Sequence, residues 1–394
     1  MSRKFVNIIL TLLTLFPLAA QTDKPLHLRL SGYVHNMQSA YFDSIQGNWI
    51  NDNLIHSRLN LQLAYKSNFT FNLSVRNRIF TGETVKYFPG YSDFVKKDMG
   101  IVPLSWNAVS EQSVLWNIAI DRLNVHYSGN NFELTIGRQR INWAKTFVWN
   151  PNDLFNNYSF FDVDYAERPG SDAIDAIYYI SPMSSVEVAS KLDRDTNITS
   201  AVKFATTIGT YDIQLLAGIL NSQDYALGLG WTGYIKNITF RGEGTYLHPK
   251  KNFADTSGLF LISIGLDYSL KNSVTFMGEF LYNPQKDNLF ITSPMDLYSA
   301  PMDVKHLSFA RYNVFAQVSA QPYPLLNTSM AFMYFPKEKG YFLMPSFTYS
   351  LADNADISII GQIFKGHFSS PANNNTTFVF NAIFIKLSLN FSTK

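Results

Sequence analysis

The stretch "NFTFNLSVRNRIF", residues 68–80, decides the fold class. Its apolar residues Phe69, Phe71, Leu73 and Val75 occupy every second position, and the positions between them are polar. Successive side chains of a β-strand point to opposite faces of a sheet, so this alternation indicates a strand with one apolar and one polar face. Such a strand needs an apolar environment on one side and water on the other.

The same alternation recurs from one end of the chain to the other, for example in "HSRLNLQLAY" (56–65) and "NAIFIKLSLNF" (381–391). The segments between Leu26 and Phe391 suggest about eighteen strands, with sixteen as the alternative. Short connections alternate with long ones, as in an up-and-down antiparallel barrel that has tight turns at one rim and open loops at the other. The long connections are expected at residues 82–111, 144–171, 283–305 and 368–376.

The composition favours a membrane barrel over a soluble protein. Among 394 residues, 16% are charged and 15% are aromatic, whereas about 25% of residues are charged in a typical soluble domain. A soluble β-sandwich shares the alternation but gives no reason for aromatic residues at strand ends, which suit a lipid–water interface. The residues expected in such aromatic girdles are Tyr65, Phe80, Tyr127, Trp143, Trp231, Tyr246, Tyr268, Phe335, Tyr349 and Phe391.

The N-terminus has the features of a secretory signal peptide over residues 1–20. Arg3 and Lys4 precede the apolar stretch "FVNIILTLLTLF" (5–16), and small residues precede Gln21. The apolar stretch is shorter than the ~20 residues of a membrane-spanning helix. We therefore expect residues 21–394 to form a barrel in the Gram-negative outer membrane, with residues 82–111, 144–171 and 283–305 as extracellular loops and no plug domain before the first strand.

Closure of the sheet follows from the physics of the bilayer. Backbone polar groups facing lipid must be paired, and only helices or closed sheets pair all of them. A barrel of eight strands is filled by its own side chains, whereas about eighteen strands leave an aqueous lumen. The predicted fold class is therefore an all-β transmembrane barrel with a polar interior.

The segment "GRQRINWAKTFVWNPNDLF" (137–155) departs from the pattern. Strict alternation after Phe132 places Arg138 and Arg140 on the lipid face, at a cost of ~2–4 kcal/mol at the membrane midplane. A bulge at Gly137 would turn both side chains into the lumen, and this is the interpretation we favour. Alternatively, the strand has already reached the interface, where the guanidinium groups extend to water.

This segment also resembles a family motif. "GRQRINW" (137–143) followed by "NPNDL" (150–154) is similar to the strand-and-loop motif of the alginate-export and related porin families of Gram-negative outer membranes. Ala144 stands where a glycine is usual and Lys145 where an acidic residue is common, and the motif covers under a tenth of the chain. The resemblance implies an outer-membrane channel, but no particular substrate.

Side chains assigned to the polar face would line the pore. Arginines dominate the first strands, so the lumen could hold or pass anions; alternatively, the arginines pair with nearby acids and stiffen the barrel. The candidate pore-lining residues are Arg29, Arg58, Arg76, Arg78, Asp121, Arg122, Arg138, Arg140, Arg241, Glu243 and Arg311.

The connection at residues 144–171 is too apolar to extend freely into water. It either folds over the mouth or inward as a constriction, or forms an outward lid that contacts lipopolysaccharide or a partner. Its candidate constriction residues are Trp149, Asp153, Asp162, Asp164 and Arg168.

Sequence motifs for catalysis and metal binding are weak. Asp162, Asp164 and Glu167 could bind Ca²⁺, but a salt bridge to Arg168 accounts for them equally well. The seven histidines show no metal-ligand spacing, and the absence of cysteine excludes thiol chemistry and disulfides. We expect neither an enzyme nor a cofactor. The histidines are His27, His35, His56, His126, His248, His306 and His367.

These observations predict a passive porin-like channel for small hydrophilic solutes or oligosaccharides, with anions as one option. The expected partners are outer-membrane lipid, lipopolysaccharide and the solute. A net charge of +2 without a basic block gives no sign of a nucleic-acid partner. The alternative is a non-conducting outer-membrane barrel that serves as a surface, assembly or partner-binding component.

Overall fold

The computed structural model describes residues 26–156, 160–164, 167, 170–284, 303–370 and 373–393. Strands dominate this part of the chain, and the predicted signal peptide lies outside it. The first nine strands are β1 (Leu26–Phe42), β2 (Trp49–Tyr65), β3 (Phe69–Gly82), β4 (Ser105–Ser110), β5 (Val114–Ser128), β6 (Phe132–Gln139), β7 (Ser171–Ser181), β8 (Ser184–Leu192) and β9 (Ile198–Ile208). The others are β10 (Tyr211–Leu220), β11 (Asp224–Ile235), β12 (Ile238–Pro249), β13 (Leu259–Ser269), β14 (Thr275–Tyr282), β15 (Tyr312–Tyr323), β16 (Leu326–Phe335), β17 (Gly340–Ala352), β18 (Ala355–Ser370) and β19 (Asn373–Ser392).

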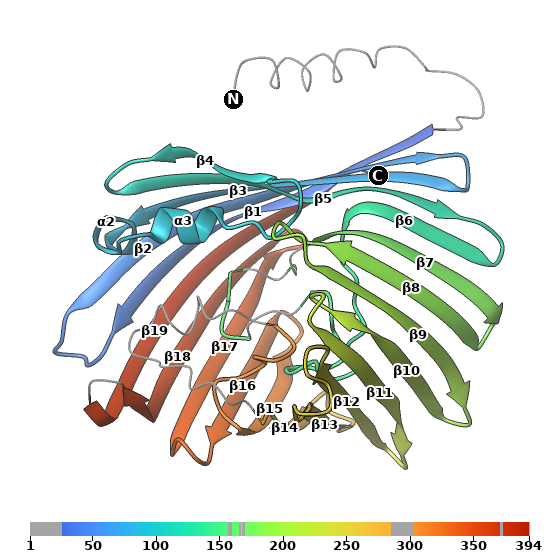
Figure 1. The fold of residues 1–394 in the computed structure, drawn as a ribbon. Helices are drawn as coiled ribbons and strands as arrows, with labels where there is room; N and C mark the ends of the chain where they lie inside the picture. Colours follow the sequence, from blue (N-terminus) through green and yellow to red (C-terminus); the bar gives the residue numbers. More distant parts are fainter. Residues whose placement is uncertain are drawn as a thin grey trace.

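The strands form a closed barrel in which each strand is antiparallel to its neighbours (Figure 1). The first and last strands close it, with Ser31 of β1 opposite Ser392 of β19. β4 is an additional short strand, paired with the part of β5 that lies beyond the end of β6. Eighteen strands therefore make up the barrel wall, which confirms the predicted fold class.

Register separates an outward apolar face from an inward polar one. Val34 and Leu389 are opposite each other on β1 and β19, and both are exposed on the outer surface. The next residue of β1, His35, is opposite His56 of β2, and both histidines are buried inside the barrel. Exposed leucine, isoleucine, valine and aromatic side chains recur around the outer surface, so this face suits acyl chains and not water.

The two rims differ. One rim, here called the turn rim, carries the start of β1, the end of β19 and short turns such as residues 66–68, 129–131 and 236–237. The opposite loop rim carries the connections 83–113, 140–170 and 283–311. Helices α2 (Glu83–Tyr87) and α3 (Tyr91–Lys96) belong to the first of these connections, and no helix in the described residues is long and apolar enough to cross a membrane.

One predicted connection is wrong. Residues 368–376 were expected to form a long loop, but β18 continues to Ser370 and β19 begins at Asn373. Backbone pairing extends through Phe368 opposite Thr376. The threonine, phenylalanine and valine residues at 376–380 favour extended structure, and the asparagines at 373–375 belong to β19, with Asn373 opposite Ser370 of β18.

Two aromatic residues expected in the girdles lie elsewhere. Trp143 and Phe335 are each 1% exposed, because both are packed inside the barrel. Tyr65 and Phe391, by contrast, are exposed on the outer surface near the turn rim. The position of an aromatic residue near a strand end did not distinguish a membrane-interface residue from one that packs inward.

Candidate lumenal site

Four arginines on β2, β3 and β5 form one side of the lumen; we call Arg58, Arg76, Arg78 and Arg122 the arginine wall. Register places Arg58 directly opposite Arg76. The two guanidinium groups share the Asp121 carboxylate, at 3.1 Å from Arg58 Nη1 and 3.5 Å from Arg76 Nε. The carboxylate of Asp121 thus links an arginine of β2 to an arginine of β3.

Asp121 reaches this position through a β-bulge. The register between β3 and β5 shifts at Ser74 and Val75, where Asp121 is the extra residue of β5. A bulge re-aims the side chain of the extra residue, and Asp121 points to the same face as Arg58. Because of the bulge, Asp121 and the next residue, Arg122, both face inward, so an acid lies within the row of arginines.

Arg122 and Arg78 differ in their partners. Arg122 Nη2 lies 3.6 Å from Glu167 Oε2, and the same carboxylate lies 4.0 Å from Arg58 Nη2. Arg78 donates to the Val95 carbonyl and the Asn117 side chain, which are both neutral. Its buried Nε–H has no acceptor among the described residues, so Arg78 contributes a positive charge that no contacting carboxylate neutralises.

Residues 141–156, here called the lumenal segment, lie inside the barrel against the wall opposite the arginines. Trp143 donates from its indole nitrogen to Glu187 of β8, and Gln214 of β10 donates to the Trp143 carbonyl. Lys203 of β9 sits over the Trp143 ring at 5.1 Å and pairs with Glu187. Phe155 packs edge-on against Trp143, so the segment is fixed by both apolar and polar contacts.

Two buried glutamates hold the backbone of this segment. Glu279 of β14 accepts hydrogen bonds from the amides of Phe147, Val148 and Trp149 at 2.8–3.0 Å. Glu243 of β12 accepts from the Thr146 hydroxyl and, at 3.2 Å, from the Lys145 amide. A buried amide without an acceptor destabilises the fold. The two glutamates therefore supply the hydrogen-bond acceptors that the carbonyl groups of an adjacent strand would otherwise provide.

Asp164 attaches a later part of the same connection to the arginine side. Its Oδ1 lies 2.8 Å from His35 Nε2 and 2.9 Å from His56 Nδ1, and the Tyr33 hydroxyl lies 3.3 Å from His56 Nε2. Burial alone would raise the pKa of the Asp164 carboxyl, but hydrogen bonds and positive charge from the two histidines outweigh it and lower the pKa well below its usual range. Asp164 and Glu167 therefore contact different partners and do not form one calcium site.

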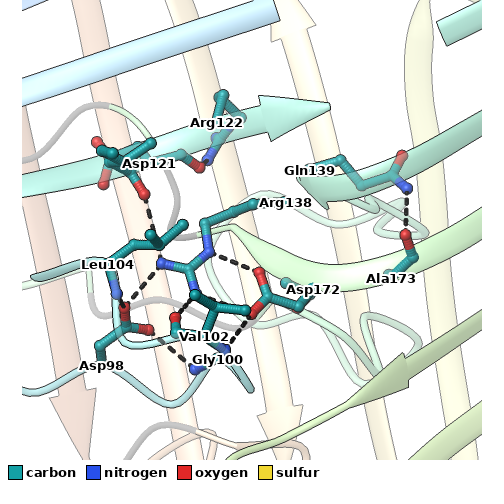
Figure 2. A network of polar contacts seen from close by, with 12 residues as sticks. Asp98, Gly100, Val102, Leu104, Asp121, Arg122, Arg138, Gln139, Asp172 and Ala173 are labelled. Atoms are coloured by element: carbon teal, nitrogen blue, oxygen red, sulfur yellow. Dashed lines mark hydrogen bonds and ion pairs between the residues drawn. The ribbon is translucent and has the colours of Figure 1, made fainter. Parts of the chain in front are cut away.

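The expected bulge at Gly137, which would turn Arg138 into the lumen, is wrong. β5 and β6 pair without a register shift there, and Arg138 lies opposite Leu123 and Asp172 on the outward-facing side. The chain avoids an arginine in lipid in another way. Residues 98–104 cover the opening left where β6 ends, and the Arg138 guanidinium binds them (Figure 2).

The contacts in Figure 2 give acceptors to most of the N–H donors of this guanidinium group. Arg138 donates to both oxygens of Asp172 at 2.7 and 2.9 Å, to Asp98 at 2.7 Å and to the Val102 carbonyl at 2.8 Å. A Cβ atom on Gly100 would collide with the guanidinium group. Arg138 therefore closes the wall and does not line the pore, and residues 98–104, far away in the sequence, gave no signal of this contact.

The other predicted residues lie apart from this cluster. Arg29 is exposed on the inward side of β1 near the turn rim, and Arg241 pairs with Asp267. Arg140 and Arg311 are exposed just outside β6 and β15. The remaining residues belong to the connection 140–170: Asp153 is buried in the lumenal segment, Asp162 accepts a hydrogen bond from the Asp164 amide, and Arg168 lies outside the described residues.

Comparisons with known proteins give a likeness in structure alone. No protein-family model and no curated protein matches the sequence. OccK8 (OprE) of Pseudomonas aeruginosa matches with a TM-score of 0.59 and 9% identity over 93% of this chain and 98% of its own. OccAB1 of Acinetobacter baumannii has a TM-score of 0.58 and 9% identity over 93% and 97% of the two chains. OprD of Pseudomonas aeruginosa has the same score and identity over 93% and 96%. The chain therefore has the closed eighteen-strand fold seen in the OprD/Occ porins of Gram-negative outer membranes.

Proposed function

We propose that the protein is a passive outer-membrane channel for small hydrophilic solutes, with anions as the preferred class. The observation that carries the proposal is the division of the barrel interior. The lumenal segment packs on the β8–β14 side, which leaves the arginine wall as the charged surface beside the path. A barrel of this strand number encloses space for water, and no energy source is needed for diffusion.

The preference for anions rests on the balance of charge along the arginine wall. Asp121 and Glu167 are the acids that pair with Arg58, Arg76 and Arg122, whereas Arg78 contacts only neutral oxygens among the described residues. Fixed charge at a narrow point sets the sign of the ions that pass. A guanidinium group also binds carboxylate or phosphate through paired N–H donors, so oligosaccharides that carry acidic groups fit this surface.

The proposed orientation puts the turn rim in the periplasm and the loop rim outside the cell. The start of β1 and the end of β19 lie at the turn rim, and barrels of this type have short periplasmic turns. Export would use residues 1–20 as a cleaved signal peptide. The outward face would contact outer-membrane lipid, and the loops would contact lipopolysaccharide.

Planar-bilayer recording of the purified mature chain tests the proposal. We expect stable open steps and a reversal potential in a KCl gradient that indicates anion preference. The double variant Arg76→Gln/Arg78→Gln should shift the reversal potential towards cation preference, because two lumenal positive charges are removed. Arg194→Gln, a matched control in the connection between β8 and β9, should leave it unchanged.

The outcomes separate the candidate functions. An unchanged reversal potential in the double variant would overturn anion selection by the arginine wall. A folded barrel that inserts into the bilayer but passes no current would overturn the channel itself. That second result would favour the competing function, a surface or assembly component whose loops bind a partner.

A further inference from the structure

Three potential metal ligands meet at one point on the inner wall. His35 of β1 and His56 of β2 are directly opposite each other in the register, and Asp164 approaches both from the connection between β6 and β7. His35 Nε2, His56 Nδ1 and an Asp164 oxygen all lie within 4.8 Å of one another. All three side chains are largely buried, so their positions are fixed by the fold.

The spacing of these atoms is close to that around a tetrahedral ion. The two nitrogen–oxygen distances are 2.8 and 2.9 Å. Zinc–ligand distances of ~2.0–2.2 Å place neighbouring ligands about 3.4 Å apart. Each of the two nitrogen–oxygen pairs would therefore have to open by roughly half an ångström to hold such an ion, and the ligand atoms of the two histidines already lie within 4.8 Å of each other.

A further contact orients one of the imidazoles. The Tyr33 hydroxyl lies 3.3 Å from His56 Nε2, the nitrogen that faces away from Asp164. A metal-binding histidine commonly uses its second ring nitrogen in a hydrogen bond that fixes the tautomer and the ring orientation. A phenol can donate to this nitrogen in the metal-free state and accept from its N–H when Nδ1 binds a metal.

The cluster borders a cavity, and the positive charge of Arg78 lies close to it. Asp164 lines a cavity of about 250 Å³ together with Asp162, Asp52 and Arg78. Arg78 is opposite His56 in the register, and its charge disfavours a cation bound by electrostatic attraction alone. Nitrogen ligands beside a positive charge favour an ion with strong affinity for imidazole, such as Zn²⁺, over Ca²⁺ or Mg²⁺.

We propose that His35, His56 and Asp164 form a binding site for Zn²⁺ or a similar transition-metal dication. The bound ion would join β1 and β2 to residues 160–164 of the connection between β6 and β7, and water would complete its coordination. The site does not depend on what the channel carries. Metal occupancy would fasten this connection to the arginine wall and narrow the lumen.

Zinc binding to the full mature chain in detergent tests the site directly. We expect wild-type protein, stripped with a chelator, to bind one equivalent of ZnCl₂ in isothermal titration. Co²⁺ should give the absorption bands of a tetrahedral or five-coordinate nitrogen–oxygen site. His35→Gln/His56→Gln should weaken binding by more than about 100-fold, since both nitrogen ligands are lost, and Tyr33→Phe by about 10-fold.

A matched variant distinguishes this site from adventitious binding. His126 of β5 hydrogen-bonds Thr135 and is outside the cluster, so His126→Gln should retain wild-type affinity. Heat-dependent electrophoretic mobility confirms that each variant is a folded barrel. No zinc binding by wild-type protein up to 1 mM, or equal binding by the double variant and the wild type, would overturn the proposal. These outcomes leave the channel proposal untouched because conductance is measured without metal.

Discussion

The two sides of the lumen use charged residues in opposite ways. On β2, β3 and β5, the arginines Arg58 and Arg76 share the Asp121 carboxylate, and among the described residues Arg78 donates only to neutral oxygens. On β12 and β14, the buried acids Glu243 and Glu279 hold backbone amides of the lumenal segment. Under the proposed function, inward-facing charge thus acts on the solute on one side, whereas it holds the lumenal segment in place on the other.

Strand parity therefore identifies the face on which a side chain lies but not the role of that side chain. Glu243 and Arg58 are both on inward-facing strand positions and both are buried. Their roles diverge because the lumenal segment covers one and not the other. Substitutions on the β12–β14 side should therefore mainly lower the stability of the barrel, and substitutions in the arginine wall should mainly change its ion selectivity.

The largest effect is expected at Glu279. Glu279→Ala removes the acceptor of three backbone amides and of the Ser263 hydroxyl. Leaving several buried donors unpaired should lower the free energy of unfolding by roughly 3–5 kcal/mol. Urea unfolding in lipid, followed by tryptophan fluorescence, measures this change.

Glu133→Ala provides the matched control for Glu279. Glu133 accepts one exposed hydrogen bond from Tyr179, so its loss should cost less than about 1 kcal/mol. Equal destabilisation by the two variants would contradict the structural role assigned to Glu279 on the β12–β14 side. Increased open-channel noise in Glu279→Ala would further show that the lumenal segment had been released.

Asp121→Asn tests the opposite side and should affect both properties. It leaves Arg58 and Arg76 without their shared carboxylate, which should cost about 2–3 kcal/mol in a wall partly hydrated by the lumen. Because a negative charge is lost, the reversal potential should move towards stronger anion preference. Asp212→Asn is the control, since Asp212 lies near the turn rim, away from the arginine wall, and accepts a hydrogen bond from Thr207. A shift towards cation preference would contradict the assigned sign of this wall.

The smallest effect is expected at Thr146. Its hydroxyl contacts Glu243 and the Trp149 carbonyl within the lumenal segment, and Thr146→Val keeps its shape while removing these contacts. We expect a loss of about 1–2 kcal/mol and no change in ion preference. A changed reversal potential in this variant would show that the β12–β14 side also controls selectivity.

Alternation was sufficient to predict the barrel because lipid and water impose a period of two on every strand. Residues 68–80 and 381–391 lie on β3 and β19 with the expected faces. Parity also placed Arg58 and Arg76 on the inner face, where the structure shows them sharing Asp121. A local rule works for these positions because the environment on each side of a strand is uniform.

Contacts between distant segments could not be predicted in this way. Arg138 occupies an outward-facing position of its strand but does not meet lipid, because residues 98–104 cover it. Trp143 was expected at the membrane interface, but it lies inside the barrel and donates a hydrogen bond to Glu187 of β8. The pairing of His35 with His56 depends on the register of two strands. Combining the parity of adjacent strands with a hairpin register would have found that pair, whereas the position of the lumenal segment requires the folded barrel.

The seam between β1 and β19 has a consequence for biogenesis. The wall is completed by pairing Ser31 of β1 with Ser392 of β19, so a polypeptide that lacks β19 would expose two unpaired edges. Edges of this kind cannot be placed in lipid and invite association with other chains. Closure of the wall therefore requires the final 20-residue strand, β19, and until β19 has paired with β1 the open edges of the sheet need to be kept away from lipid and from other chains.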